Sequence, residues 1–174
     1  FWDANPCGET LVGKDQEWAT FFQRYDEFRY RTEGHILGEL DRLNLAGKNV
    51  LEIGIGQAAD SAQIIHRGGR WHGLDLTAEA VFRAKTRFEL FRLPYQAIKQ
   101  GSATAIPYPD KTFDLVYSHG VLHHIPPIRQ VSQEIRRVLK PGGKLVIMMY
   151  HKHSLNYLVS INIVRRLLMI GLFG

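Results

Sequence analysis

The chain has 174 residues, of which 45% are hydrophobic and 22% are charged. This composition is typical of a folded globular domain and excludes a chain that is disordered along most of its length. A single cysteine, Cys7, excludes an internal disulfide, and the start Phe1-Trp2-Asp3 lacks the basic and then apolar order of a secretory signal. We therefore expect one cytoplasmic domain.

The formal net charge of +5 is concentrated in the last third of the chain. Residues 111–174 contain nine Lys and Arg against two Asp and Glu. Such a surplus attracts nucleic acid or anionic lipid, but it is also typical of a solvated face with a cation-rich helix end. We favour the solvated face and expect no nucleic-acid partner.

The first 47 residues are predicted to form an arm followed by helices. Glycines and a proline interrupt the arm over 1–15. Apolar and aromatic side chains recur near helical spacing over 16–43, which predicts one or two helices, with Gly34 as the break in the case of two.

From residue 48 to residue 150, short apolar runs alternate with helical patterns. The pattern predicts strands over 49–53, 71–76, 95–99, 113–118 and 144–150, with helices over 58–66, 78–93 and 128–139. This alternation predicts an α/β, doubly wound, mostly parallel sheet with helices on both faces. Ligands of such sheets bind beyond the carboxyl ends of the strands.

The segment 155–173 is apolar but is interrupted by the pair Arg165-Arg166. A membrane span requires about 20 mostly apolar residues without such charges. We expect an amphipathic helix within a C-terminal region, 151–174. It packs on this chain or on a neighbour, or contacts a membrane surface.

The turn after the first predicted strand carries the main chemical signal. Gly54 and Gly56 lack a Cβ, so a ligand can approach the backbone, although many nucleotide-binding turns share this property. Glu52 is more informative. Its carboxylate repels the pyrophosphate of a dinucleotide but attracts the ammonium and sulfonium of S-adenosylmethionine. The alternative for Glu52 is a cap on the turn.

Asp75 ends the second predicted strand, and an acid at that place accepts the ribose hydroxyls of a nucleoside. The following Leu76 either packs on the adenine or belongs to the core.

Several segments, in chain order, resemble the motifs of class I S-adenosylmethionine-dependent methyltransferases, with the greatest similarity to the small-molecule and quinone-type group. The segments are 50–59, 73–76, 101–114, 117–126 and 137–143. The resemblance covers roughly 48–150 and implies a Rossmann-like methyltransferase fold with strand order 3-2-1-4-5. The family sheet has two further strands, for which no candidates follow Tyr150. We therefore expect a truncated sheet whose edge is covered by 155–173 or by a second copy in a homodimer.

The resemblance also implies roles for the matching residues. It assigns the methionine end of the cofactor to Glu52, Gly54 and Gly56, the ribose to Asp75, the adenine to Ser102 and Ala103, and the floor of the pocket to Ser118 and His119. Two positions depart from the family pattern. Ser102 stands where an acid is frequent, and Ala58 stands where a third glycine is common.

The N-terminal helices resemble the lid of the family. An arginine there would pair with the carboxylate of the cofactor, and aromatic rings would face its sulfonium. Packing of the helix on the sheet is the alternative. The candidates are Trp18, Tyr25, Arg29, Tyr30 and Arg31.

His119, His123 and His124 follow the fourth predicted strand. A neutral imidazole can serve as a general base, so these three are the candidate catalytic residues, with a structural role in the turn as the alternative. No Cys, Asp or Glu lies in 117–126 to complete a metal site, so we expect no metal.

The predicted function is methyl transfer from S-adenosylmethionine to an O, N, C or S atom of a small molecule, with S-adenosylhomocysteine as product. A cofactor-binding but inactive interaction module or fragment is one alternative, and an NAD-dependent oxidoreductase is another. A nucleic-acid methyltransferase is the third, but Ser118-His119-Gly120-Val121 stands where an amino-methyltransferase has its aromatic tetrad with proline.

Overall fold

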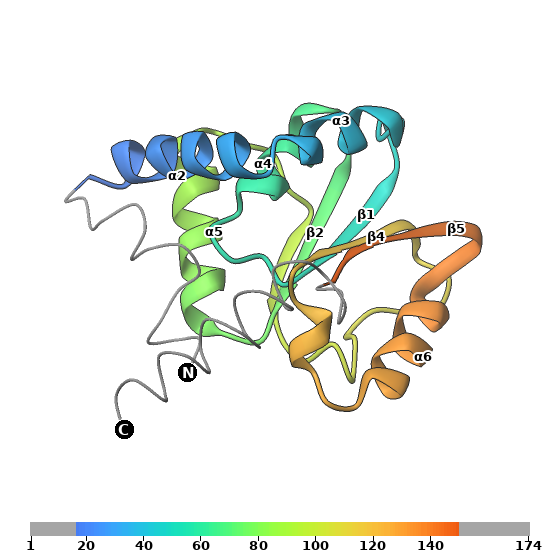
Figure 1. Cartoon of the computed structure of the whole chain (residues 1–174). Coiled ribbons are helices and arrows are strands. Elements are labelled where there is room, and N and C mark those ends of the chain that lie inside the picture. Colours follow the sequence, from blue (N-terminus) through green and yellow to red (C-terminus); the bar gives the residue numbers. More distant parts are fainter. Residues whose placement is uncertain (1–16, 150–174) are drawn as a thin grey trace, which may run out of the picture.

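The structure of the protein is a computed structural model that describes residues 17–149. Its centre is a five-stranded sheet in the order β3-β2-β1-β4-β5, in which all neighbouring strands are parallel (Figure 1). This order confirms the predicted fold class. The strands are β1 (Asn49–Ile53), β2 (Arg70–Asp75), β3 (Ala97–Gln100), β4 (Phe113–His119) and β5 (Leu139–Met148).

Helices cover both faces of the sheet, and α2 lies across α5 at one edge of the molecule (Figure 1). The helices are α2 (Trp18–Thr32), α3 (His35–Arg42), α4 (Ala59–His66), α5 (Ala78–Leu90), the short 3-10 helix η1 (Leu122–His124) and α6 (Ile128–Val138). Of the one or two helices predicted for the N-terminal region, the structure has two, α2 and α3, which separate at Gly34.

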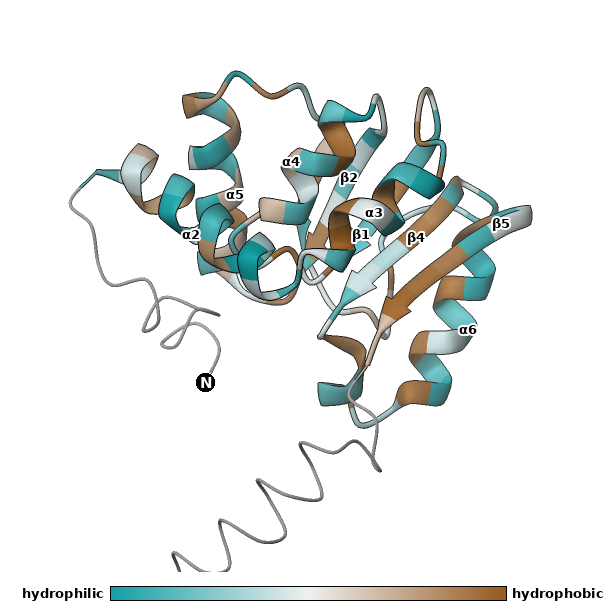
Figure 2. Ribbon diagram, turned by 45° about the horizontal axis from the view of Figure 1, so that its top comes forward, coloured by the Kyte–Doolittle hydropathy of each residue, from teal (hydrophilic) through white to brown (hydrophobic). Residues whose placement is uncertain are grey.

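The alternation of side chains along the strands builds two apolar cores. Val50 of β1 packs with α3, α4 and α5, whereas its neighbour Leu51 packs with α6 on the other face. Trp71 and Phe88 are large members of the first core, and Phe113 is one of the second. Figure 2 shows hydrophobic residues along β5 and hydrophobic and hydrophilic residues alternating along α6.

Two boundaries differ from the sequence prediction by three residues or more, and the other boundaries of the sheet and its helices agree within two residues. Strand β5 begins at Leu139 rather than at residue 144, because Pro141 and Gly142 are accommodated in an irregular start where the register against β4 shifts. Helix α5 ends at Leu90 rather than at residue 93, where Arg92 takes a φ of 51°. Pro94 also disfavours helical backbone in the residue before it.

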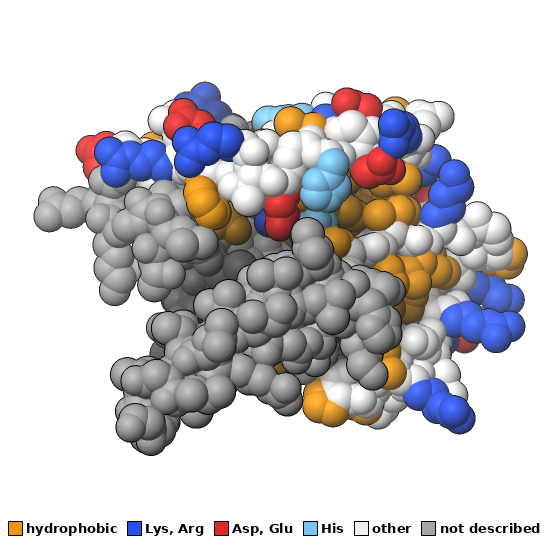
Figure 3. Space-filling model, viewed as in Figure 1, with side chains coloured by type: hydrophobic (Ala, Val, Ile, Leu, Met, Phe, Trp, Pro, Cys, Tyr) orange, Lys and Arg blue, Asp and Glu red, His pale blue; other side chains and the backbone are white. Residues whose placement is uncertain are grey.

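Lys and Arg side chains gather on the side of the molecule formed by α6 and β5 (Figure 3). Arg129, Arg136 and Lys144 are exposed there. The predicted arm over 1–15, with Cys7, and the predicted helix over 155–173 lie outside the described residues. Within 17–149, no helix has the length and apolar character needed to cross a membrane.

Candidate functional site

The turn between β1 and α4 is built on left-handed backbone. Gly54, Gly56 and Ala58 have φ values of 82°, 54° and 58°. A Cβ on Gly54 would lie 2.2 Å from Cγ2 of Val121, so this position requires glycine for space as well as for conformation. A Cβ on Gly56 would meet nothing within 4 Å. The space in front of Gly56 is therefore open.

The carboxylate of Asp75 joins the end of β2 to this turn. Its Oδ2 accepts from the backbone N–H of Ile55 at 2.8 Å and from that of Gly56 at 3.5 Å. Its Oδ1 accepts from the N–H and the hydroxyl of Thr77, each at 2.9 Å. Asp75 therefore shapes the turn and the start of α5 while it faces the open space.

A cavity of about 310 Å³ lies beyond the carboxyl ends of the strands, within the usual size range of small-molecule sites. Glu52 and Asp75 line the same cavity, as the sequence prediction required. Eleven of the predicted site residues line it, namely Tyr25, Arg29, Glu52, Gly54, Gly56, Asp75, Leu76, Ser102, Ala103, His119 and His124.

Five predicted site residues do not line this cavity. Trp18 stacks on Phe22 within α2, with their ring centroids 5.5 Å apart. Ser118 is buried, and its hydroxyl donates to the carbonyl of Ile53 at 2.8 Å, which ties β4 to β1 below the site. The hydroxyl of Tyr30 donates to Asp60 at 3.2 Å. Arg31 is exposed on α2, and His123 lies on η1 with its ring centroid 4.0 Å from that of His124.

Glu52 is a buried carboxylate whose direct partners are neutral. Only 3% of its surface is exposed. Its Oε2 accepts from the hydroxyl of Ser61 at 2.6 Å and from the indole Nε1 of Trp71 at 2.7 Å. Burial, followed by the nearby charge of Asp60, raises the pKa of Glu52 to about 8.

Asp60, in the first turn of α4, is a functional candidate that the sequence prediction missed. It is 4% exposed, and Nε of Arg29 donates to its Oδ1 at 2.7 Å while Nη2 donates to Oδ2. The hydroxyl of Tyr117 donates to Oδ2 at 2.8 Å. Burial acts to raise the pKa of Asp60, but the hydrogen bonds and charge of Arg29 outweigh it and hold the pKa below its usual value.

His119 is enclosed by the charged groups of α2. Its Nδ1 lies 3.2 Å from Nη2 of Arg29, which is an obligate donor, so Nδ1 is the acceptor. Its Nε2 lies 3.7 Å from Oε2 of Glu33. Burial, followed by the positive charge of Arg29, lowers the pKa of His119 and favours the neutral ring. Both ring nitrogens therefore face protein groups.

The side chains around the cavity do not balance in charge. Arg29 pairs with Asp60, and Nε of Arg83 pairs with Oε1 of Glu79 at 2.6 Å. Among the ion pairs of the described residues, none involves Glu52 or Asp75. The cavity therefore presents the carboxyl groups of Glu52 and Asp75 to a ligand, with no cation from the described residues paired to either. No three His, Cys, Asp or Glu residues in 17–149 are grouped so that they could hold a metal ion.

A family profile described as "Methyltransferase domain" matches residues 51–147 of this chain. Among curated proteins, the chain is 32% identical over 120 residues to a phosphatidylethanolamine N-methyltransferase of Cereibacter sphaeroides, covering 68% of this chain and 55% of that protein. It is 32% identical over 130 residues to a demethylmenaquinone methyltransferase of Halalkalibacterium halodurans, covering 72% of this chain and 50% of that protein. The chain thus spans about half the length of these relatives.

Among solved structures, the chain is similar to the YcgJ protein of Bacillus subtilis, with a TM-score of 0.60 and 27% identity. The alignment covers 66% of this chain and 50% of that one.

Proposed function

Because the chain belongs to the methyltransferase domain family, we propose that it binds S-adenosylmethionine and transfers the methyl group to an O, N, C or S atom of a small-molecule acceptor. The observation that carries this proposal is Glu52, a buried carboxylate beside an open glycine turn with no cation paired to it. A buried charge without a counterion is costly, and a cationic ligand supplies the counterion.

The same electrostatics argue against a dinucleotide. A pyrophosphate in the turn would lie close to Glu52 and Asp75, and no free arginine of the described residues balances these two carboxylates. An ammonium and a sulfonium are attracted by the same groups. We therefore rank an NAD-dependent oxidoreductase below a methyltransferase.

The residues around the cavity fit the parts of S-adenosylmethionine. We assign Asp75 to the ribose, Leu76, Ser102 and Ala103 to the adenine, and Glu52 to the ammonium, with Gly54 and Gly56 as the surface on which the methionine part lies. Leu76 is 66% exposed beside the cavity, so an adenine ring would cover apolar surface that is otherwise wet. When bound, this cofactor supplies an already activated methyl group.

Arg29 is our choice among the N-terminal arginines for the cofactor carboxylate, because Arg29 lines the cavity and Arg31 is exposed on α2. Arg29 is already held by Asp60, which fixes the direction of its guanidinium. Tyr25 also lines the cavity. We infer that the helices of the N-terminal region, α2 and α3, act as a lid over the sheet, with α2 as the part that contacts the ligand.

For acceptors that lose a proton, we propose His124 as the general base. It lines the cavity on η1 and is exposed, whereas both nitrogens of His119 face Arg29 and Glu33. We assign His119 to positioning of α2. A base within reach of the acceptor is sufficient, because positioning and exclusion of water supply most of the remaining catalysis.

We propose a cytoplasmic location, because one cysteine is compatible with a reducing compartment.

Leu145, Ile147 and Met149 are exposed on and just after the edge strand β5. We propose that a second copy of the chain covers this edge in a homodimer. We further propose that the segment 155–173 contacts a membrane surface. Sedimentation of the protein with and without lipid vesicles separates these assignments.

Calorimetric titration with S-adenosylhomocysteine and with NAD tests the cofactor. We expect binding of the first alone, and binding of NAD alone would contradict the proposal. An acceptor panel that includes an aminophospholipid and a quinol then tests turnover, because two relatives are named for such acceptors. Binding without turnover across the panel would favour the inactive interaction module instead.

A further inference from the structure

One wall of the cavity consists of irregular backbone. Gly101, Ser102 and Ala103 line the cavity at the start of the connection between β3 and β4. This connection, over 101–112, contains no helix or strand. Some of its backbone groups pair within the connection, as the N–H of Ala105 does with the carbonyl of Ser102 at 3.1 Å, but the carbonyls of Ile106 and Tyr108 also take partners from outside it.

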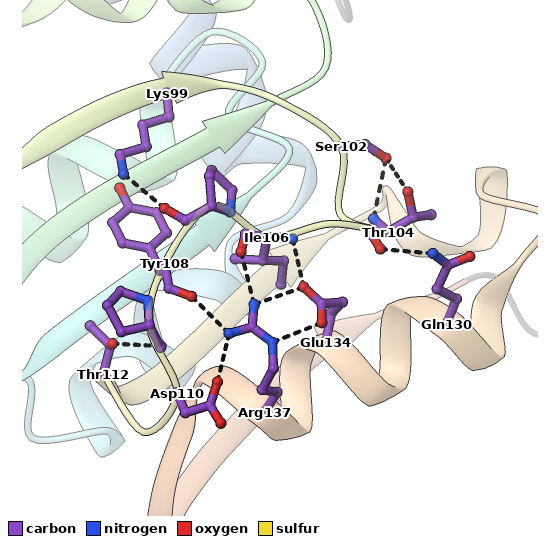
Figure 4. A network of polar contacts seen from close by, with 12 residues as sticks. Lys99, Ser102, Thr104, Ile106, Tyr108, Asp110, Thr112, Gln130, Glu134 and Arg137 are labelled. Atoms are coloured by element: carbon purple, nitrogen blue, oxygen red, sulfur yellow. Dashed lines mark hydrogen bonds and ion pairs between the residues drawn. The ribbon is translucent and has the colours of Figure 1, made fainter.

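Helix α6 supplies these partners through Arg137 (Figure 4). Nη2 donates to the carbonyl of Ile106 at 2.8 Å, and Nη1 donates to the carbonyl of Tyr108 at 2.8 Å. Nη1 also donates to Oδ1 of Asp110 at 2.9 Å. One planar guanidinium thus fixes three successive parts of the connection, which a flexible lysine side chain cannot reproduce.

Glu134 completes the arrangement from the preceding turn of the helix. Its two carboxylate oxygens accept from Nε and Nη2 of Arg137, each at 2.8 Å. Its Oε2 also accepts from the backbone N–H of Ile106 at 2.7 Å. Both polar backbone groups of Ile106 are therefore held by one ion pair.

Gln130 extends the same helix face toward the cavity. Its Nε2 donates to the carbonyl of Thr104 at 3.0 Å. The N–H of Thr104 donates to the hydroxyl oxygen of Ser102 at 3.2 Å, and the two hydroxyl oxygens are 2.7 Å apart. Residues at spacings of three and four share one face of a helix, so α6 grips the connection along a continuous row.

We infer that Gln130, Glu134 and Arg137 form a clamp that positions residues 102–106, of which Ser102 and Ala103 line the cavity. The clamp thereby sets the affinity of the cavity for the adenosine part of its ligand. None of the three lines the cavity, so they act through Ser102 and Ala103 as positioning residues. The inference rests on the proposed function for the identity of the ligand. The inference goes beyond the proposed function because it assigns a role to three residues of α6 that lie behind the cavity wall and position the part of it that contacts adenosine.

The apolar contacts of the connection are not an adequate substitute for the clamp. Ala103 and Ile106 are buried against the α6 core, which anchors their side chains. Apolar packing is non-directional, however, whereas hydrogen bonds to backbone groups fix orientation. Small displacements of a binding wall have large effects on ligands that it contacts.

The test compares Arg137→Gln with Arg136→Gln in the full chain. Arg136 is the neighbouring exposed arginine, so its substitution removes the same charge without touching the clamp. Calorimetry measures the Kd of S-adenosylhomocysteine and of adenosine at a temperature where each variant is folded. We expect Arg137→Gln to weaken both ligands by a similar factor of about tenfold and Arg136→Gln to leave both unchanged. Gln130→Ala should weaken both by a smaller factor.

Arg137→Lys provides the second comparison, because it retains the charge but not the fork. We expect it to resemble Arg137→Gln rather than the wild type. Unchanged Kd values for Arg137→Gln, with only a lower Tm, would show a merely structural role and overturn the inference. A loss confined to S-adenosylhomocysteine, with adenosine unaffected, would also overturn it.

Amide hydrogen exchange of the ligand-free protein provides a readout that does not depend on the ligand. We expect exchange over 102–110 to accelerate in Arg137→Gln and not in Arg136→Gln, and equal rates would contradict the clamp. A wild type that binds neither ligand would refute the proposed function and the assignment to adenosine. Accelerated exchange would in that case still identify the residues that hold the wall.

Discussion

The wall of the cavity near α2 and α4 and the wall near α6 are both stabilised by an arginine paired with a carboxylate, but in different surroundings. Asp60 is 4% exposed and Arg29 is 17% exposed, whereas Arg137 is 30% exposed. Buried pairs are costly to break, because removal of one partner leaves an uncompensated charge. Partly exposed pairs such as Arg137 with Glu134 contribute less to stability by their charge, and their value lies in geometry. The arginine pair at the first wall therefore contributes mainly to the free energy of unfolding, whereas the pair at the second wall contributes mainly by fixing the position of the backbone.

The largest expected effect comes from breaking the buried pair. Asp60→Asn removes the charge that holds Arg29 and leaves the side-chain shape almost unchanged. We expect a loss of about 3–5 kcal/mol in the free energy of unfolding, measured by urea denaturation. The control is Asp41→Asn, because Asp41 accepts from Nε of Arg67 at 2.8 Å on the exposed surface. It should lose no more than about 1 kcal/mol, and equal losses would invalidate the comparison.

The next effect distinguishes two glycines of the turn. Gly54→Ala places a Cβ against Val121 in addition to a strained φ, so we expect a loss of about 3 kcal/mol in the free energy of unfolding. Gly56→Ala carries the strained φ without the clash, and we expect a loss of about 1 kcal/mol. Its Cβ would enter the open space in front of the turn, so it should weaken S-adenosylhomocysteine more than its stability change suggests. Equal thermal shifts for the two variants would contradict this assignment of space.

The third prediction uses the ionisation of Glu52. Its pKa is about 8 in the folded chain against a usual value of 4.5, so the folded state binds more protons between these values. The contribution of Glu52 to the free energy of unfolding should therefore be greatest below pH 4.5 and should decline as the pH rises toward 8. The ammonium of S-adenosylhomocysteine, which we assign to Glu52, favours the carboxylate, so binding of this ligand should release a proton and tighten as the pH rises from 6 to 8.

Calorimetry in buffers of different ionisation enthalpy measures this proton release. The affinity gain from one linked proton is at most about tenfold per pH unit. Glu52→Gln should remove both the proton release and the pH dependence. A wild type whose affinity is flat across this range would exclude a protonated Glu52 in the free site.

The smallest effect concerns Ala58. This residue is fully buried and has a φ of 58°, a conformation that is unfavourable for a side chain with a Cβ. Ala58→Gly relieves the strain but increases the freedom of the unfolded chain. We expect a net stabilisation of about 0.5 kcal/mol, visible as a small rise in Tm, with ligand affinity unchanged. A decrease in Tm would show that the methyl group contributes more by packing than it costs in strain.

The sheet and the open turn are the parts that the sequence predicted well. The runs around Val50 and Val116 are apolar, short and bounded by glycine or polar residues, and such local patterns are sufficient to predict a parallel sheet, whereas its strand order was implied by the family resemblance. Once the strands are ordered, Glu52 and Asp75 meet at one edge because the carboxyl ends of parallel strands coincide. These predictions needed only local pattern, topology and the family resemblance.

Other parts of the site depend on contacts between distant segments. Asp60 gains its importance from Arg29, 31 positions earlier, and from Tyr117, 57 positions later, and nothing beside it in the sequence indicates either partner. Its place in the first turn of a helix was the one available signal, and a carboxylate is ordinary there. Helical geometry places Arg29 and Arg31 on different faces of α2, but the sequence does not specify which of these faces points toward the cavity. The family resemblance assigned Ser118 to the floor of the pocket, whereas its hydroxyl donates to the carbonyl of Ile53 in β1.

The hydrogen bond from Trp71 to Glu52 has a practical consequence. The indole is fully buried and its N–H is directed at the carboxylate whose charge is expected to change when a cationic ligand arrives. Indole emission is sensitive to nearby charge, so Trp71 gives the protein a built-in optical sensor of its own site. A spectrometer and a Trp71→Phe blank are sufficient to follow occupancy in real time, without any label or coupled assay.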